Sequence, residues 1–196
     1  SRGLGDVYKR QTLYKYDDSR LSNTQKSTKK IAIFDYENQL RELRDFPYLD
    51  YPLNQIGGIH LNTVEFMSGM HPIRNKSEAN DYIKRVNLIK EVYEGVLKDL
   101  EKQADAGIYP PEFVYEHVIE QLDEFINFSY EEHPLFTQFM KKVNDLDITS
   151  EEMASLEEAI KNGIDESVTP GFVLLRDFMV RTQKNANENH GIWSPP

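Results

Sequence analysis

Apolar residues recur at three- and four-residue spacing along most of this chain, which is the pattern of helices with one buried face. The first run covers residues 30–45, and its apolar side consists of Ile33, Tyr36, Leu40 and Leu43. Ser27 or Thr28 can accept the unpaired amide hydrogen bonds at the start of this helix, and Pro47 disfavours its continuation. The pattern predicts a single amphipathic helix here.

A second run predicts a long helix from Ser77 to about Ala106, with Ser77 as its N-cap and Gly107 as its stop signal. Its stripe suits packing along another helix and consists of Tyr82, Val86, Ile89, Tyr93, Val96 and Leu100. Further helices are expected after Pro110-Pro111 and after His133-Pro134, because proline at the first helical position loses no hydrogen bond.

The last predicted helix follows a capping box formed by Thr149 and Glu152. Its apolar side consists of Ile160, Ile164, Val168, Phe172, Leu175 and Met179. Pro170 lies inside this stripe and should kink the helix just before it. The sequence contains no internal repeat and no strand pattern of any length. It therefore predicts an all-α fold, an irregular array of helices with one long loop segment.

That loop segment runs from Phe46 to Pro72 and is rich in aromatic residues, amides and glycine without a clear period, although a short helix over residues 61–67 can fall within it. Asn54 and Gln55 stand beside Gly57-Gly58, and side-chain amides both donate and accept hydrogen bonds, as a peptide backbone requires. Asn54, Gln55 and the nearby His60 are therefore the candidate substrate-binding residues. The alternative is structural: the same amides fix the loop by internal hydrogen bonds.

Composition narrows the function classes. The formal net charge is −10, and no cluster of Lys and Arg is interleaved with aromatic residues, so a nucleic-acid partner is not expected. No apolar run approaches the roughly 20 residues that span a bilayer, so no transmembrane segment is expected. Residues 1–11 resemble a translated adaptor and are interpreted as an artefact leader. Residues 12–29 are interpreted as a polar lead-in, and residues 30–196 as the helical part.

The candidate chemistry is sparse. Zinc peptidases place two histidines four residues apart on one helical turn, whereas no two of the five histidines have this spacing. The chain has no cysteine, no Gly-x-Ser-x-Gly nucleophile turn and no phosphate-binding loop. We predict no catalytic residue, no metal ligand and no cofactor within this chain.

Six segments in register resemble the bacterial domain-of-unknown-function family 885. They are Tyr51–Gly58, Asp81–Val86, Gly107–Pro111, His133–Phe139, Val168–Phe172 and the closing Gly191-Ile192-Trp193. Members of that family look like gluzincin-type zinc metallopeptidases that are secreted, periplasmic or lipid-anchored. Their His-Glu-x-x-Pro-Gly-His-His segment, which supplies the zinc ligands and the general base, has no counterpart in this sequence.

The resemblance implies that this chain is the N-terminal half of a larger protein, truncated at its C-terminal end, in which zinc supports hydrolysis of a peptide bond. This half would form a scaffold and one wall of a substrate channel, would be inactive alone, and would have the C-terminal half as its partner. The competing reading is a self-sufficient, non-catalytic helical binding module whose contact surface is the segment from Tyr48 to Pro72. Monodisperse, cooperative behaviour of the chain alone would favour that second reading.

Overall fold

The computed structural model describes residues 2–46, 48 and 51–187, and within these ranges the protein is all-α, as the sequence predicted. Pro47, which was predicted to disfavour continuation of the first helix, and the family-like segment Gly191-Ile192-Trp193 lie outside the described residues. The helices of the described ranges all lack the combination of length and apolar content that crossing a bilayer needs. Two compact units, Ser1–Asp50 and Tyr51–Pro196, make up the chain.

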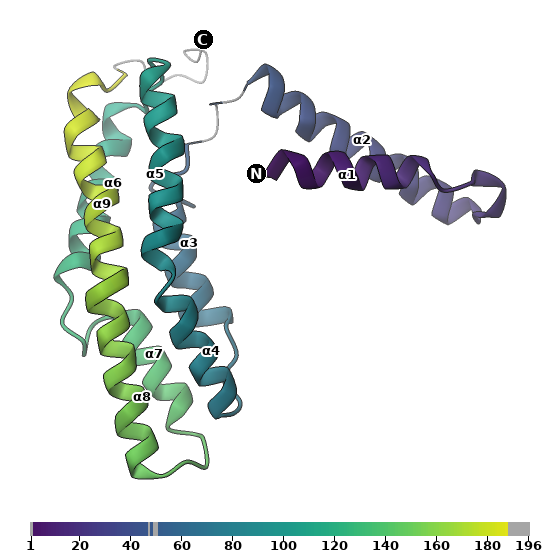
Figure 1. Cartoon of the computed structure of the whole chain (residues 1–196). Helices are drawn as coiled ribbons and strands as arrows, with labels where there is room; N and C mark the ends of the chain where they lie inside the picture. Colours follow the sequence, from purple (N-terminus) through teal and green to yellow (C-terminus); the bar gives the residue numbers. More distant parts are fainter. Residues whose placement is uncertain (1, 47, 49–50, 188–196) are drawn as a thin grey trace. The chain divides into compact units, whose positions relative to one another are not determined.

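The first unit is a pair of packed helices, α1 (Arg2–Tyr14) and α2 (Asn23–Asp45), joined through the 3₁₀ turn η1 (Asp18–Arg20) (Figure 1). The Tyr14 hydroxyl donates a 2.7 Å hydrogen bond to Glu37 and so links the two helices. Helix α1 thus covers much of the stretch interpreted as an artefact leader. The division into leader, lead-in and helical part stays a prediction.

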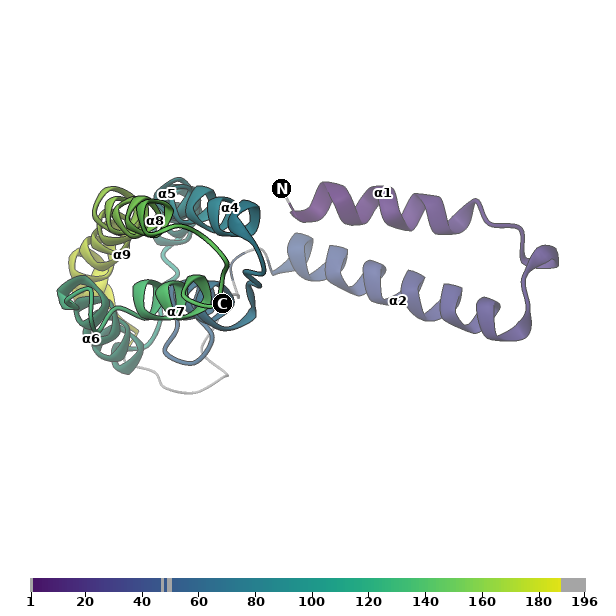
Figure 2. The same cartoon turned by 90° about the horizontal axis from the view of Figure 1, so that it is seen from below.

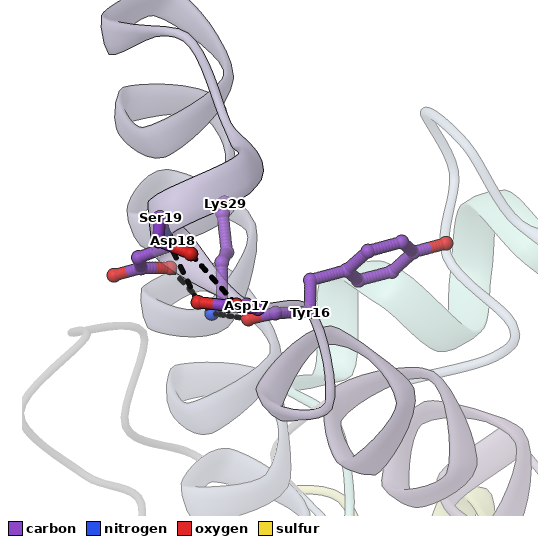
Figure 3. Close-up of polar contacts among 5 residues, drawn as sticks. All are labelled: Tyr16, Asp17, Asp18, Ser19 and Lys29. Atoms are coloured by element: carbon purple, nitrogen blue, oxygen red, sulfur yellow. Dashed lines mark hydrogen bonds and ion pairs between the residues drawn. The ribbon is translucent and has the colours of Figure 1, made fainter.

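Polar contacts hold the turn between α1 and α2 (Figure 3). The Lys29 Nζ donates to the Tyr16 carbonyl oxygen at 2.7 Å and to the Asp18 carboxylate at 2.8 Å. The Asp17 carboxylate accepts hydrogen bonds from the amide and the hydroxyl of Ser19. The Lys29 ammonium lowers the pKa of the Asp18 carboxyl. Charge-assisted hydrogen bonds therefore fix the reversal of the chain.

Helix α2 begins at Asn23, seven residues before the predicted start at residue 30. Its N-cap is Ser22, whose hydroxyl accepts from the Gln25 amide while the Gln25 side chain accepts from the Ser22 amide. Neither Ser27 nor Thr28 is the cap, and the Thr28 hydroxyl instead bonds the Thr24 carbonyl inside the helix. The reciprocal cap at Ser22 satisfies two amides at once, which explains the earlier start.

The second unit contains the remaining helices. They are α3 (Ile59–Glu65), η2 (Phe66–Met70), α4 (Lys76–Val86), α5 (Ile89–Asp105), α6 (Glu112–Asn127), α7 (Pro134–Val143), α8 (Ser150–Gly163), η3 (Ile164–Val168), α9 (Thr169–Thr182) and η4 (Gln183–Asn185). Helix α9 packs along both α5 and α6, while α8 packs against α4 and α7. Figures 1 and 2 show α8 and α9 as one continuous rod that runs through both groups. Two three-helix groups thus share one core.

Aromatic side chains fill this core. Tyr82 lies between His71 and Phe139, with ring centroids 5.1 Å and 5.0 Å away, and Phe172 stacks on Phe125 at 5.1 Å. The largest fully buried side chains include Tyr82, Tyr93, Tyr115, Phe139, Phe172 and Leu122. The predicted apolar faces of this second unit therefore point inward, whereas no residue of the face predicted for residues 30–45 is buried and its Leu43 is exposed.

The predicted helix from Ser77 to Ala106 is in fact two helices, α4 and α5, separated at Asn87 and Leu88. The hydroxyl of Ser167, which lies in η3, accepts a 3.1 Å hydrogen bond from the Lys90 amide. A tertiary contact therefore caps the start of α5 and supports the break. The N-cap of α4 is Asn75, whose side chain accepts from the Glu78 amide, so Ser77 is not the cap.

The predicted stop at Gly107 is confirmed. Gly107 has φ of +74°, a left-handed conformation that glycine adopts without strain. The Gly107 amide bonds the Ala104 carbonyl, and the Ile108 amide bonds the Gln103 carbonyl. These two bonds make a Schellman motif, which satisfies the last carbonyls of α5.

In the part of the chain that the structure describes, the turns η2 and η3 are widened into π-helix. Turn η3 lies directly before Pro170, where the sequence predicted a kink. There the Thr169 amide bonds the Ile164 carbonyl, five residues back. Proline has no amide hydrogen and its ring collides with the preceding turn, so a wider turn relieves the clash without ending the helix. The predicted disturbance therefore takes the form of a π turn.

Candidate functional site

The loop from Tyr51 to Gly58 is held by the side chain of Asn54. Its Oδ1 accepts hydrogen bonds from the amides of Ile56 at 3.1 Å and Gly57 at 2.8 Å, and its Nδ2 donates to the Tyr51 carbonyl oxygen at 3.1 Å. An asparagine that bonds its own following backbone makes a compact turn. Asn54 is therefore committed to the structural role that the sequence left open, and its substrate-binding role stays a prediction.

His60 is fully buried at the start of α3 and meets Gln121 of α6, with 3.0 Å between its Nε2 and the Gln121 Oε1. The Gln121 Nε2 donates to the carbonyl oxygen of Gln55 at 3.1 Å. Since the amide nitrogen of Gln121 is used there, its oxygen faces a protonated Nε2 of a neutral His60 ring. Burial lowers the pKa of His60, which favours this neutral form.

Gly58 allows the His60 ring to pack tightly against the loop. A Cβ at this position would lie 2.5 Å from the Asn54 carbonyl oxygen and 2.6 Å from the His60 ring. Gln121 thus joins the Gln55 backbone and the His60 side chain, two of the three predicted positions. Sequence reasoning missed Gln121, because no local pattern connects an amide on α6 with a loop more than 60 residues earlier.

An apolar groove of about 390 Å³ opens on the other side of the same segment. One wall is made by α3 and η2, and the other by the end of α4 and the start of α5. Its lining residues are Ile59, Asn62, Thr63, Phe66, Met67, Arg85, Leu88, Ile89, Val92 and Tyr93. Sequence reasoning placed a contact surface between Tyr48 and Pro72, and this segment supplies one wall of the groove.

The groove has a buried floor and an exposed rim. Met67, Ile89 and Tyr93 are buried, whereas Phe66, Leu88 and Val92 keep 47%, 52% and 51% of their surface exposed. Exposed apolar side chains beside a concavity favour binding of another apolar surface. Arg85 adds a cationic side chain to the otherwise apolar lining.

The buried histidines each use one ring nitrogen within the fold. The His71 Nδ1 lies 2.9 Å from the Pro72 carbonyl oxygen, and the His133 Nδ1 accepts from the Leu135 amide at 3.2 Å as the N-cap of α7. Burial lowers the pKa of His71 and lowers that of His133 to about 4. The Nδ1 of His60 and the Nε2 of His71 and of His133 have no hydrogen-bond partner in the described part of the chain.

A zinc site needs three or four such side chains converging on one point. Within residues 2–46, 48 and 51–187, no three His, Cys, Asp or Glu side chains form a group that can hold a metal ion. The described residues therefore do not fit a zinc ion, and the absence of a metal ligand from the whole chain stays a prediction.

Comparison with known proteins identifies a family and solved structures with the same fold. The family model described as "Bacterial protein of unknown function (DUF885)" matches residues 8–194. A crystal structure of "the putative lipoprotein from Colwellia psychrerythraea" superposes with a TM-score of 0.86 at 21% sequence identity, a level that establishes the fold alone. The match covers 99% of this chain and 34% of that one, so the chain spans about a third of its solved relative. No curated protein matches.

Proposed function

This chain belongs to the bacterial family of unknown function DUF885, and from that premise we propose that it is the helical scaffold of a zinc-dependent peptidase. In this proposal the zinc ligands and the catalytic base belong to another part of a longer protein. The scaffold forms one wall of the channel that takes the peptide substrate. The family resemblance found in the sequence is confirmed; the peptidase reaction is the part that we propose.

The observation that carries the proposal is the extent of the match. The fold of this chain recurs as about a third of a longer solved chain, and no three His, Cys, Asp or Glu side chains within residues 2–46, 48 and 51–187 form a group that can hold a metal ion. The loop from Tyr51 to Gly58 is fixed by internal hydrogen bonds, as a channel wall must be if it is to position a substrate.

Gln55 is the best placed of the candidate substrate contacts, because the hydrogen bond from Gln121 uses its main chain. Gln121 holds its main chain through the carbonyl oxygen, so its side chain can change without breaking that bond. We expect Gln55→Ala to weaken peptide turnover in the longer protein while leaving its unfolding midpoint unchanged. Asn54→Ala is the matched comparison, because it removes the hydrogen bonds that shape the loop.

The decisive experiment compares this chain with the protein encoded by its extended natural reading frame. Both are purified, their zinc content is measured, and a peptide library is incubated with each and analysed by mass spectrometry. The proposal expects bound zinc and chelator-sensitive cleavage in the longer protein, and neither in this chain. Cleavage by this chain alone, or a longer protein that neither binds zinc nor cuts any peptide, would refute it.

A non-catalytic helical binding module is the second candidate function, and the apolar groove favours it. The groove has the volume of a ligand site, within the range of about 300–1,000 Å³ that such sites occupy. Light scattering and thermal unfolding separate the two functions. A complete module is monodisperse and unfolds cooperatively, whereas part of an enzyme associates through its exposed apolar surface.

The cellular location belongs to the same proposal. We infer a secreted, periplasmic or lipid-anchored protein, supported by the family resemblance and by the words "putative lipoprotein" in the description of the solved structure. Fractionation of cells that express the extended reading frame tests this inference. Recovery of the protein only with the cytoplasm would contradict it.

A further inference from the structure

We propose that the apolar groove between α3–η2 and α4–α5 is the docking site for an amphipathic helix from the part of the longer fold that this chain does not span. The inference rests on one part of the proposed function, that this chain belongs to a longer protein, and does not require the peptidase reaction. It identifies the kind of partner and the surface that receives it.

The groove is suited to a helix because its two walls are themselves helical ridges. Phe66 stands on one ridge, and Leu88 and Val92 stand four residues apart on the other, so their side chains lie one turn from each other. Such paired ridges bind an incoming helix that presents apolar residues at three- and four-residue spacing. About half of each rim side chain is exposed in this chain.

Gly95 extends the same face of α5 by one further turn. It lies three residues after Val92, is exposed, and has no heavy atom within 4 Å of the position where a Cβ would stand. Glycine weakens a helix interior relative to alanine, and no neighbour in the described part of the chain requires it here. A small residue on an exposed helical face permits the close approach of a second helix.

The extent of the solved relative indicates where this helix comes from. Its fold contains the fold of this chain as about a third of its length, so most of that larger structure lies outside the part matched here. A second copy of this chain is a poorer occupant, because two chains of net charge −10 repel each other. The cationic Arg85 in the groove favours a helix whose apolar face is flanked by acidic side chains.

The test uses the absence of cysteine from this chain. Val92→Cys places one thiol on the rim of the groove, and Glu94→Cys places one on the same helix about 200° away around its axis. Both positions are exposed, so both variants should fold. The rate of maleimide labelling is measured at each position in this chain and in the longer protein, with the labelled peptides identified by mass spectrometry.

We expect the Val92→Cys thiol to react at least tenfold more slowly in the longer protein than in this chain, while the Glu94→Cys thiol reacts at similar rates in both. Equal rates at Val92→Cys would overturn the docking proposal. If the Val92→Cys thiol of this chain is labelled more slowly as the protein concentration rises, the occupant is a second copy of the chain, and the docking proposal is also overturned. The readout is independent of catalysis, so a longer protein without peptidase activity but with a protected groove refutes the proposed function and leaves the docking site standing.

Discussion

Some polar side chains of the types found in binding sites have a structural role in this protein. Asn54 looks like a substrate contact in the sequence, yet its amide is used by the backbone of its own loop. His133 belongs to a residue type common in metal and catalytic sites, yet one of its ring nitrogens caps α7. In both cases a polar side chain satisfies buried or orphaned backbone groups, which are costly to leave unpaired.

Asn54→Ala should lower the stability of the chain by about 1 kcal/mol, because it removes the acceptor for two amides. Hydrogen exchange at the Ile56 and Gly57 amides should become faster while exchange in α9 is unchanged. Asn54→Asp is the matched control, since its carboxylate still accepts both bonds. Unaltered exchange at these two amides in Asn54→Ala would contradict the structural role.

The stability of the chain should fall as the pH drops from about 6.5 to about 4. His133 stays neutral in the folded state down to a pKa of about 4, compared with an ordinary value of 6.5. Over that interval the unfolded chain binds a proton that the folded chain does not, so acid favours unfolding by roughly 3 kcal/mol from this group. Above pH 6.5 the group is neutral in both states and contributes no pH dependence.

His133→Asn tests this effect because asparagine also caps helices but does not titrate. The variant should lose overall stability, since it lacks the ring that contacts Phe128, and its stability should depend less on pH between 4 and 6.5. Urea unfolding at several pH values measures both. His117→Asn, at an exposed position, is the control; an unchanged pH slope in His133→Asn would contradict the prediction.

Capping hydrogen bonds determine where the helices of this protein begin and end. Only some of these bonds join residues that are close in sequence. The stop at Gly107 and the capping box of Thr149 with Glu152 are local, and both were predicted and confirmed. The cap of α5 by Ser167 joins residues 77 positions apart. Sequence periodicity continues unbroken through Asn87 and Leu88, so it could not predict a break that a distant hydroxyl stabilises.

Ser167→Ala should therefore destabilise the chain by about 1 kcal/mol, the usual effect of removing a helix cap. The Lys90 amide loses its acceptor at the junction of α4 and α5, and exchange of that amide should accelerate. Ser77→Ala is the control, because Ser77 is exposed and Asn75 is the true cap of α4. Equal losses of stability in the two variants would argue against the tertiary cap.

The candidate site also could be predicted only in part from the sequence, because its walls come from segments that are distant in sequence. The sequence predicted a contact surface between Tyr48 and Pro72, and residues 59–67 of that range line one wall of the groove. That a partner binds there stays a prediction. The opposite wall comes from the junction of α4 and α5, whose exposed Leu88 and Val92 read as part of an ordinary amphipathic helix. A groove depends on which helices become neighbours, and spacing along one helix does not contain that information.

At the scale of the whole molecule, the two compact units differ in how they are stabilised. The unit Tyr51–Pro196 has an aromatic core with fully buried side chains, whereas the structure gives α2 no buried residue. Local stability follows buried apolar contact. The all-α class, the family and most helices were predictable from the sequence; the separation into these two units was not.

Amides of α1 and α2 should therefore exchange with solvent much faster than those of α5, α6 and α9. Native-state hydrogen exchange with mass spectrometry measures this directly, peptide by peptide. We expect protection of α5, α6 and α9 to approach that of global unfolding, and protection of α1 and α2 to be smaller by several kcal/mol. Equal protection in both units would show that the helix pair is stabilised by more than its own contacts.

The hydrogen bonds that Asn54 makes within its own loop affect how a partner binds. A flexible loop loses conformational entropy when a partner binds, and that loss subtracts from the affinity. The chain from Tyr51 to Gly58 has already been ordered by folding, and it leads directly into the α3 wall of the groove. A partner that binds there meets a preorganised surface. The free energy of its apolar contacts is therefore not spent on ordering the loop, and the affinity is higher.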